Sequence, residues 1–507
     1  MITKINIHFS LFTFLFSLLL TFSLLLTSCG NANVPDQFTE VNQTPRIYPD
    51  YTGVTIPINI APLTFELEDS CDELVARFKV GDSELVCGGA AVQPDMDSWR
   101  ELMTKAVGKA ISVELFVRND EQWQRYRPFQ ITVSPDSIDP YISYRLISPS
   151  YVTYEELTLN QRCLENYDET VMVNNMLCGT EKTGQCVNCH SYQQYNPRRM
   201  QFHARQYHGG TVIAYDGELR KINMRNDSIL SAGVYPAWHP WLPLIAYSTN
   251  KTSQSFHTHN KNKIEVFDSA SDLIVYRLDK NEVTNIENDP NEFEVFPFWA
   301  PDGKTLYYCS AHFEFHDSIG HDVETVRRAK EIKYNIYKKA FNPDTYVFGP
   351  RELVFQADSL DKSATLPRIS PDGRYLMFTL GNYGVFHIWH HEADLYLMDL
   401  ADGTVRSMDE INSNDTESYH SWSGNGRWVI FSSRRYDGGY TRPFIAHIDA
   451  DGKGSKPFEL PQADPDYHRQ LMKCYNVPEF MHGPVEVTPQ QFASVLKAGD
   501  GEPVKYK

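Results

Sequence analysis

Hydrophobic and polar residues alternate in short runs over most of this 507-residue chain, and a period of two predicts β-strands. Between residues 51 and 136 the runs are "LTFELED", "ELVARFKVGDSELVCGG", "ISVELFVRND" and "YRPFQITVS", separated by residues that favour turns. One stretch with a helical period, "DSWRELMTKAVGKA", interrupts them. We therefore expect a small amino-terminal β-sandwich over residues 51–136.

A longer pattern recurs in the second half of the chain. Its four clear copies are "PAWHPWLPLIAYSTN", "PFWAPDGKTLYYCSA", "PRISPDGRYLMFTLG" and "HSWSGNGRWVIFSSR". Each copy has a strand, a tight turn and an alternating strand, and a second strand pair follows each copy. Four strands per repeat predict the blades of a β-propeller over residues 209–465. The segment "GGTVIAYDGELRKINM" is predicted to be the outer half of a further blade, giving five or six blades in all.

These Pro-Asp-Gly repeats resemble the WD40-like repeat of TolB-type propellers, and the resemblance covers about residues 209–462. It implies a propeller fold and says almost nothing about function. The expected fold class is mainly β: a β-sandwich, a short helical segment over residues 137–208 and a TolB-like propeller. Residues 466–507 are expected to be a carboxy-terminal tail.

The amino terminus predicts export. Lys4 precedes an apolar run from Phe9 to Leu26, which is typical of a secretory signal over residues 1–28. The run is almost long enough for a transmembrane anchor, but it ends in "LTSCG", which resembles the lipobox of bacterial lipoproteins. That resemblance implies that Cys29 carries a lipid, followed by a tether over residues 29–50.

The resemblance also implies that the protein lies in the cell envelope and is anchored to the outer membrane of a bacterium. No acidic cluster follows Cys29, which favours the side facing the periplasm. The formal charge of −18 and a pI near 5.4 argue against nucleic acid as a partner, because a phosphate-binding surface needs a basic stripe.

The segment "CVNCH" carries the most specific chemistry. If it is helical, Cys186, Cys189 and His190 project from one face. Covalent attachment of one haem c needs that arrangement, with two thioether bonds and His190 as the proximal iron ligand. A zinc site would need a second Cys/His pair of similar spacing. A redox dithiol would need a βαβ context, and a disulfide at this spacing would cross-link nothing.

The second iron ligand is less well defined by the sequence. His203 is the favoured distal ligand, because Arg205 beside it could pair with a haem propionate. His208 and Met200 are the alternatives, and Met481 qualifies only if the carboxyl terminus folds back. In this setting a histidine can also be an ordinary loop or core residue.

The region from Ile138 to Thr211 resembles a group of exported Bacteroidetes-type proteins. In that group a single cytochrome c motif is embedded before a TolB-like propeller. The resemblance covers nearly the whole chain after the signal and implies location and cofactor more than reaction.

Loops between the second and third strands of the blades are expected to emerge on one face of the propeller. Three of them hold eight of the 17 histidines. The residues that we single out as a candidate ligand face are His387, His390, His391, Arg434, Arg435 and Arg442. Such a face could hold a ligand, a metal or a partner, or it could consist of solvated loops with a few packed aromatic residues.

Three functions follow from these patterns. The first is a membrane-anchored monohaem c-type cytochrome that transfers single electrons to an envelope redox partner, or senses redox state or a ligand. The second is a propeller scaffold that binds a protein or glycan, with a structural haem. The third is an oxidoreductase with its substrate at the histidine-rich face. No serine-hydrolase elbow and no phosphate loop is present in the sequence.

Overall fold

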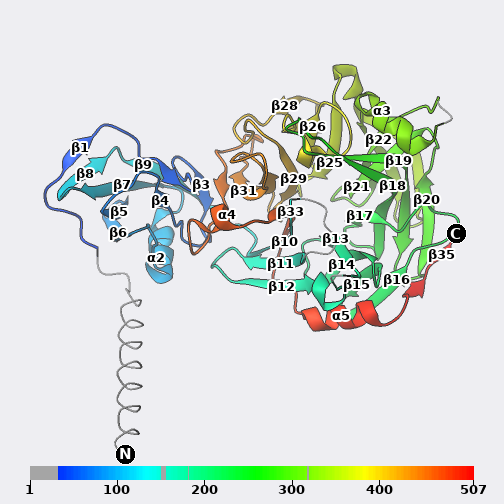
Figure 1. Cartoon of the computed structure of the whole chain (residues 1–507), viewed down its shortest axis with the longest axis horizontal. Coiled ribbons are helices and arrows are strands. Elements are labelled where there is room, and N and C mark those ends of the chain that lie inside the picture. The colour runs from blue at the N-terminus through cyan, green and yellow to red at the C-terminus, as the bar shows by residue number, and fades with distance from the viewer. Residues whose placement is uncertain (1–31, 150–155, 181, 317–318) are drawn as a thin grey trace, which may run out of the picture.

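The computed structural model describes residues 32–149, 156–180, 182–316 and 319–507. The protein is mainly β, with an amino-terminal sheet region beside a β-propeller (Figure 1). The expected signal segment and Cys29 lie outside the described residues. Within the described residues, no helix combines the length and the apolar character that crossing a membrane requires.

The amino-terminal region is all-β apart from one helix, but its strands divide unequally. Seven of them form one sheet, and β2 and β4 form a separate pair. The strands are β1 (Thr39–Val41), β2 (Ile47–Tyr48), β3 (Thr55–Pro57), β4 (Glu66–Leu67), β5 (Glu73–Val80), β6 (Ser83–Gly89), β7 (Ala110–Asn119), β8 (Gln122–Tyr126) and β9 (Phe129–Ser134). β1 pairs with β8 and β2 pairs with β4, so both strands belong to the folded region. The tether is therefore shorter than the expected residues 29–50.

Helix α2 (Met96–Ala106) confirms the single helical stretch of this region. The Asp95 side chain accepts a hydrogen bond from the Ser98 backbone N–H at 3.0 Å and so caps the helix. Trp99, Leu102 and Met103 form its buried face.

Six blades of four strands each form the propeller in the described residues. From the axis outwards, blade 1 consists of β33 (Cys474–Met481), β10 (Tyr141–Ile147), β11 (Thr158–Cys163) and β12 (Glu169–Asn174). Blade 2 consists of β13 (Gln185–Tyr192), β14 (Arg199–Gln206), β15 (Gly210–Tyr215) and β16 (Glu218–Asn223). Blade 3 consists of β17 (Val234–Trp238), β18 (Leu244–Phe256), β19 (Ile264–Arg277) and β20 (Glu282–Glu287). Blade 4 consists of β21 (Glu292–Trp299), β22 (Thr305–His312), β23 (Asn335–Asn342) and β24 (Val347–Phe355). Blade 5 consists of β25 (Ser363–Ile369), β26 (Tyr375–Gly381), β27 (Asp394–Asp399) and β28 (Val405–Ser407). Blade 6 consists of β29 (Glu417–Trp422), β30 (Trp428–Ser433), β31 (Arg442–His447) and β32 (Phe458–Glu459). Blades 3 and 4 are joined into one sheet through β19 and β21, and β34 (Glu502–Pro503) and β35 (Lys505–Tyr506) add to blades 2 and 3.

The ring is closed by strands from distant parts of the chain. In blade 1, β33 pairs antiparallel with β10, so that Tyr141 lies opposite Met481. The propeller therefore runs from Tyr141 to Met481 and is larger than the expected 209–465. The segment 137–208 supplies three strands of blade 1 and two of blade 2, and the expected tail supplies the closing strand.

The rest of the carboxy-terminal segment packs on the rim of the propeller. Helix α5 (Pro489–Lys497) contacts β12 and β15, β34 (Glu502–Pro503) adds to β16, and β35 (Lys505–Tyr506) adds to β20. In Figure 1 this segment is the red band below and beside blades 2 and 3.

The amino-terminal sheet and the propeller share one hydrophobic core. Leu74 and Trp99 belong to the same cluster of buried residues as Trp428 and Phe458 of blade 6 and Tyr475 of blade 1. The two regions are therefore packed together and not merely joined by a linker.

The inner strand of every blade contains a β-bulge at the same place. In each, two residues oppose one residue of the neighbouring strand, and the first of the two has φ between 50° and 55°. The six pairs are Cys189–His190, Tyr235–Pro236, Phe296–Pro297, Leu366–Pro367, Tyr419–His420 and Val477–Pro478. Proline is tolerated at four of them because a bulge frees one N–H from the ladder. We call the six first residues the bulge ring.

The bulge corrects the conformation expected for "CVNCH". Residues 186–190 are not helical: they lie in β13, and the backbone of residues 185–188 pairs with residues 203–206 of β14. Pairing with β14 satisfies the backbone groups that a helix would have satisfied internally. The carbonyl of Cys189 accepts a hydrogen bond from the Gln201 amide.

Candidate functional site: an axial cavity

A cavity of about 350 Å³ lies inside the propeller, and all six residues of the bulge ring line it. Since each blade contributes the same position of its inner strand, the cavity lies on the propeller axis. Its volume is within the range of roughly 300–1,000 Å³ that small-molecule and cofactor sites occupy. A second cavity of about 140 Å³ shares Pro236, Arg368 and Glu479 with it and continues towards the Pro-Asp-Gly turns.

The three residues of the haem motif all line this axial cavity. In a regular strand, side chains at i and i+3 point to opposite faces, so Cys186 and Cys189 would diverge. The bulge adds one residue between Asn188 and Ser191 and so brings both thiols and His190 to one cavity. The convergence predicted for a helix is thus reached by a bulged strand.

His190 is held as a neutral imidazole. Its side chain is buried, and burial together with the nearby Arg145 lowers its pKa to about 3. Among the described residues, its Nε2 has no hydrogen-bond partner. Neutral imidazole is the form of histidine that ligates a metal ion.

The second histidine of a bulge, His420, occupies the same place in blade 6. It is also buried, and burial lowers its pKa to about 3. Its Nε2 lies 3.1 Å from the Met377 carbonyl oxygen, and the residue does not line the axial cavity. A histidine at this position therefore fits the fold by itself, and His190 differs from it in being one of the residues that line the cavity.

The thiol of Cys189 is partly buried, and burial raises its pKa while the Arg205 guanidinium acts in the opposite direction. Cys186 is also partly buried and packs against the core between blades 1 and 2. Cys186, Cys189 and His190 all belong to the lining of one cavity, and these are the residue types that a covalently held haem would use. No group of three or more His, Cys, Asp or Glu in metal-binding geometry occurs in the described part of the chain.

The candidate distal ligands do not line the axial cavity. His203 is buried on β14, its Nδ1 lies 3.0 Å from Thr211 Oγ1, and it lines a separate cavity together with His208. Met200 and Met481 are fully buried in the core between blades 1 and 2. Among the described residues that line the axial cavity, His190 is the only histidine and none is a methionine.

Five residues of the candidate ligand face lie on loops between the second and third strands of blades 5 and 6, and Arg442 begins β31. Most of their side chains are engaged within the protein. His387 is buried, with Nδ1 2.9 Å from Thr365 Oγ1, and burial lowers its pKa to about 3. The buried Arg434 donates to the carbonyls of Ile388 and Gly438. Arg435 pairs with Glu417 at 3.0 Å, and Arg442 donates to the Lys473 and Leu471 carbonyls.

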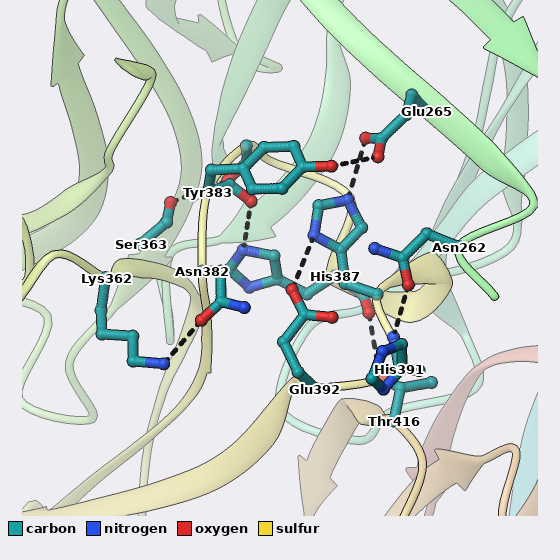
Figure 2. Close-up of polar contacts among 12 residues, drawn as sticks. Asn262, Glu265, Lys362, Ser363, Asn382, Tyr383, His387, His391, Glu392 and Thr416 are labelled. Carbon is teal, nitrogen blue, oxygen red and sulfur yellow. Dashed lines mark hydrogen bonds and ion pairs between the residues drawn. The ribbon is translucent and has the colours of Figure 1, made fainter. Parts of the chain in front are cut away.

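His390 belongs to a polar cluster that joins blade 3 to blade 5 (Figure 2). Its Nε2 lies 2.9 Å from the Glu265 carboxylate, which also accepts from Tyr383 Oη at 2.6 Å and contacts His257 Nε2 at 3.0 Å. Beside it, the His391 backbone N–H donates to Asn262 Oδ1 at 3.0 Å. We call Glu265, His257, Tyr383 and His390 the latch.

The latch joins two segments that line the axial cavity. Thr252, Ser253, Gln254 and Val266 of the long hairpin of β18 and β19 line it, and so does Phe386 of blade 5. The contacts of Glu265 with Tyr383 and His390 hold the hairpin against blade 5.

Sequence reasoning missed the bulge ring, although the signal was present. The inner strands read "NCHSY", "VYPAW", "VFPFW", "TLPRI", "SYHSW" and "NVPEF". Aligned on their bulges, they show that "CH" stands where other blades place an aromatic or aliphatic residue followed by proline or histidine. When each repeat is taken to begin at its inner strand, "CVNCH" becomes part of the repeat that forms blade 2.

Comparisons with known proteins find only distant likenesses to solved structures. No protein-family model and no curated protein matches the chain. Among solved structures, the propeller domain of the Trilobed protease from Pyrococcus furiosus is 12% identical, with TM-score 0.31, covering 80% of this chain and 99% of that one. A prolyl endopeptidase structure is 12% identical (TM-score 0.33; 64% of this chain, 42% of that one), and a puromycin-hydrolysing peptidase of Mycobacterium tuberculosis is 11% identical (0.34; 81% and 57%). The chain thus spans about half the length of these two peptidases, and nothing about activity follows.

The latch predicts a pH-dependent contribution to stability. Burial raises the pKa of Glu265, but hydrogen bonds from His390, Tyr383 and His257 outweigh it and place the pKa at about 2, below the ordinary 4.5. A depressed carboxyl pKa stabilises the fold above pH 4.5, and the gain is lost as the pH falls towards 2. Glu265→Gln should therefore lower the free energy of unfolding by about 2–3 kcal/mol at pH 7, and by less at pH 3.

Urea unfolding curves across this pH range measure the effect. Glu392→Gln is the matched control, since its carboxylate is 3.7 Å from His390 Nδ1 and partly exposed. Its loss should stay below about 1 kcal/mol. Equal losses in the two variants, or a Glu265→Gln loss that does not shrink on acidification, would contradict the latch.

Proposed function

We propose that this protein is a monohaem c-type cytochrome whose haem sits in the axial cavity of the propeller. The observation that carries the proposal is the bulge in β13, which brings Cys186, Cys189 and His190 to that cavity. The two thiols would form the thioether bonds, and His190 would be the proximal ligand. A haem held there would supply one-electron redox chemistry.

The protein's own residues prepare the site for such a group. His190 is kept neutral by burial, and the six-bladed ring holds its backbone in place. The hairpin of β18 and β19, held to blade 5 by the latch, contributes to the cavity wall. Because no described residue of the cavity wall offers a second histidine or a methionine, we favour the sensing of a small ligand over simple electron transfer. His203 as a distal ligand would require β14 to rearrange.

We further propose that the protein is exported and lipid-anchored at Cys29, with an envelope redox protein or binding partner. The support is the apolar run followed by "LTSCG" in the sequence. Cys29→Ala should move the protein from the membrane fraction to the soluble fraction without a change in its circular dichroism. Retention of the variant in salt-washed membranes would contradict the anchor.

A binding scaffold without haem is the second candidate. It is favoured by His420, which shows that the fold accepts histidine at the bulge with no cofactor. In that case the axial cavity binds a ligand directly, and Cys189 is simply the bulge-ring residue of blade 2.

Haem staining after denaturing electrophoresis separates the two candidates. Protein produced with a haem-attachment system should retain covalent haem, and the Cys186→Ala, Cys189→Ala double variant should lose it. His190→Ala should keep the haem but change its absorption spectrum, because the thioethers remain while the iron loses a ligand. His420→Ala, at the equivalent bulge, should keep the wild-type spectrum.

With the site opposite His190 open, the wild type should also bind carbon monoxide in the reduced state. Wild-type protein that takes up no haem under these conditions would support the scaffold instead. A spectrum that changes equally in His190→Ala and His420→Ala would refute His190 as the ligand.

A further inference from the structure

Three arginines line the axial cavity without a carboxylate partner. Arg145, Arg205 and Arg368 come from blades 1, 2 and 5, and none of them forms an ion pair with a described carboxylate. The chain has 65 acidic residues, and other arginines such as Arg435 and Arg77 do pair with them. Arg162 and Arg434 are buried elsewhere, bond to backbone carbonyls and also form no ion pair within the described residues. The three cavity arginines differ from them in lining one shared cavity.

Arg145 is rigidly placed. It is 9% exposed, and its guanidinium donates to the Val187 carbonyl at 3.3 Å and to Asn476 Oδ1 at 3.0 Å. Its buried Nε has no partner among the described residues. A buried guanidinium bonded to neutral oxygens alone leaves its charge uncompensated, which is costly until an anion binds.

Arg368 and Arg205 complete a cationic lining. The Arg368 guanidinium donates to the Pro367 carbonyl at 3.0 Å and lies 4.9 Å from the Phe298 ring centre, while Arg205 is exposed. The one carboxylate of the wall is Glu479, and burial raises its pKa to about 7. In a chain of net charge −18, this cavity is locally positive and focuses the potential on an anion.

The remainder of the wall is largely apolar. It includes Phe296, Leu366, Val266 and Phe386, with the rings of Tyr235 and Tyr419. Aromatic and aliphatic surface beside arginines suits a molecule with an apolar body and anionic ends.

We propose that the axial cavity is a binding site for an apolar ring compound that carries carboxylates, and that Arg145 and Arg205 recognise those carboxylates. The carboxylates come from a porphyrin or from a free aromatic acid. The porphyrin source rests on the proposed function, whereas the aromatic acid source does not. Planar guanidinium groups bind carboxylates through paired hydrogen bonds, which gives both affinity and orientation.

The test uses the full chain carrying Cys186→Ala and Cys189→Ala, made without haem attachment so that the cavity is accessible. The probes are protoporphyrin IX, its dimethyl ester, and 2-naphthoate, and quenching of tryptophan fluorescence measures binding. Protoporphyrin IX should bind at least about tenfold more tightly than the ester, which lacks the charges. Arg145→Gln and the exposed Arg205→Gln should each reduce this preference severalfold.

Arg225→Gln is the matched control, because Arg225 is exposed and lines the neighbouring cavity only. It should leave both affinities unchanged. Arg205→Gln keeps the test valid if the buried Arg145→Gln fails to fold.

Comparison of protoporphyrin IX with 2-naphthoate distinguishes the two sources of the carboxylates. Arginine-dependent binding of protoporphyrin IX alone identifies a porphyrin as the occupant. Arginine-dependent binding of 2-naphthoate alone upholds the carboxylate site while removing support for haem. Three results would overturn the proposal. They are equal affinities for protoporphyrin IX and its dimethyl ester, an unchanged affinity in both arginine variants, and no binding of either protoporphyrin IX or 2-naphthoate.

Discussion

The pairing of β33 with β10 is the constraint on which the rest of the propeller depends. One blade is built from both ends of the ring, so the pairing of β33 with β10 ties the last part of the propeller to the first. Closure places six inner strands around one axis with their bulges at one level. The axial cavity exists because all six strands depart from regular pairing at that level.

The bulge gives the segment "CVNCH" its geometry. A helix brings residues i, i+3 and i+4 to one side by its period, whereas a strand does so only by inserting one residue. Every blade has that insertion, so the bulge belongs to the scaffold and does not depend on the cysteines. Cys186, Cys189 and His190 then differ from the other blades in chemistry and not in backbone. The unpaired arginines add charge to the same cavity, and the hairpin held by the latch contributes to its wall.

The sequence predicted the fold class well because alternation and tight turns are local signals. Four blades and the outer half of a fifth were identified from the sequence, because in each of them the strands and the tight turn between them lie within a short stretch of the chain. Blade 1 could not be assembled from the sequence, because its strands come from Tyr141 to Asn174 and from Cys474 to Met481, and only tertiary pairing joins them. The helical expectation for "CVNCH" failed for a related reason: pairing with β14 decides the conformation, and spacing alone does not reveal it. The latch and the buried arginines were visible as residue types, but their partners lie in other blades.

The most direct measurement is an anomalous difference map at the iron absorption edge from crystals of protein produced with haem attachment. The account predicts one iron peak on the propeller axis, within the bulge ring and next to His190. A peak near His203 or on the outer surface, or crystals of folded protein without iron, would contradict it.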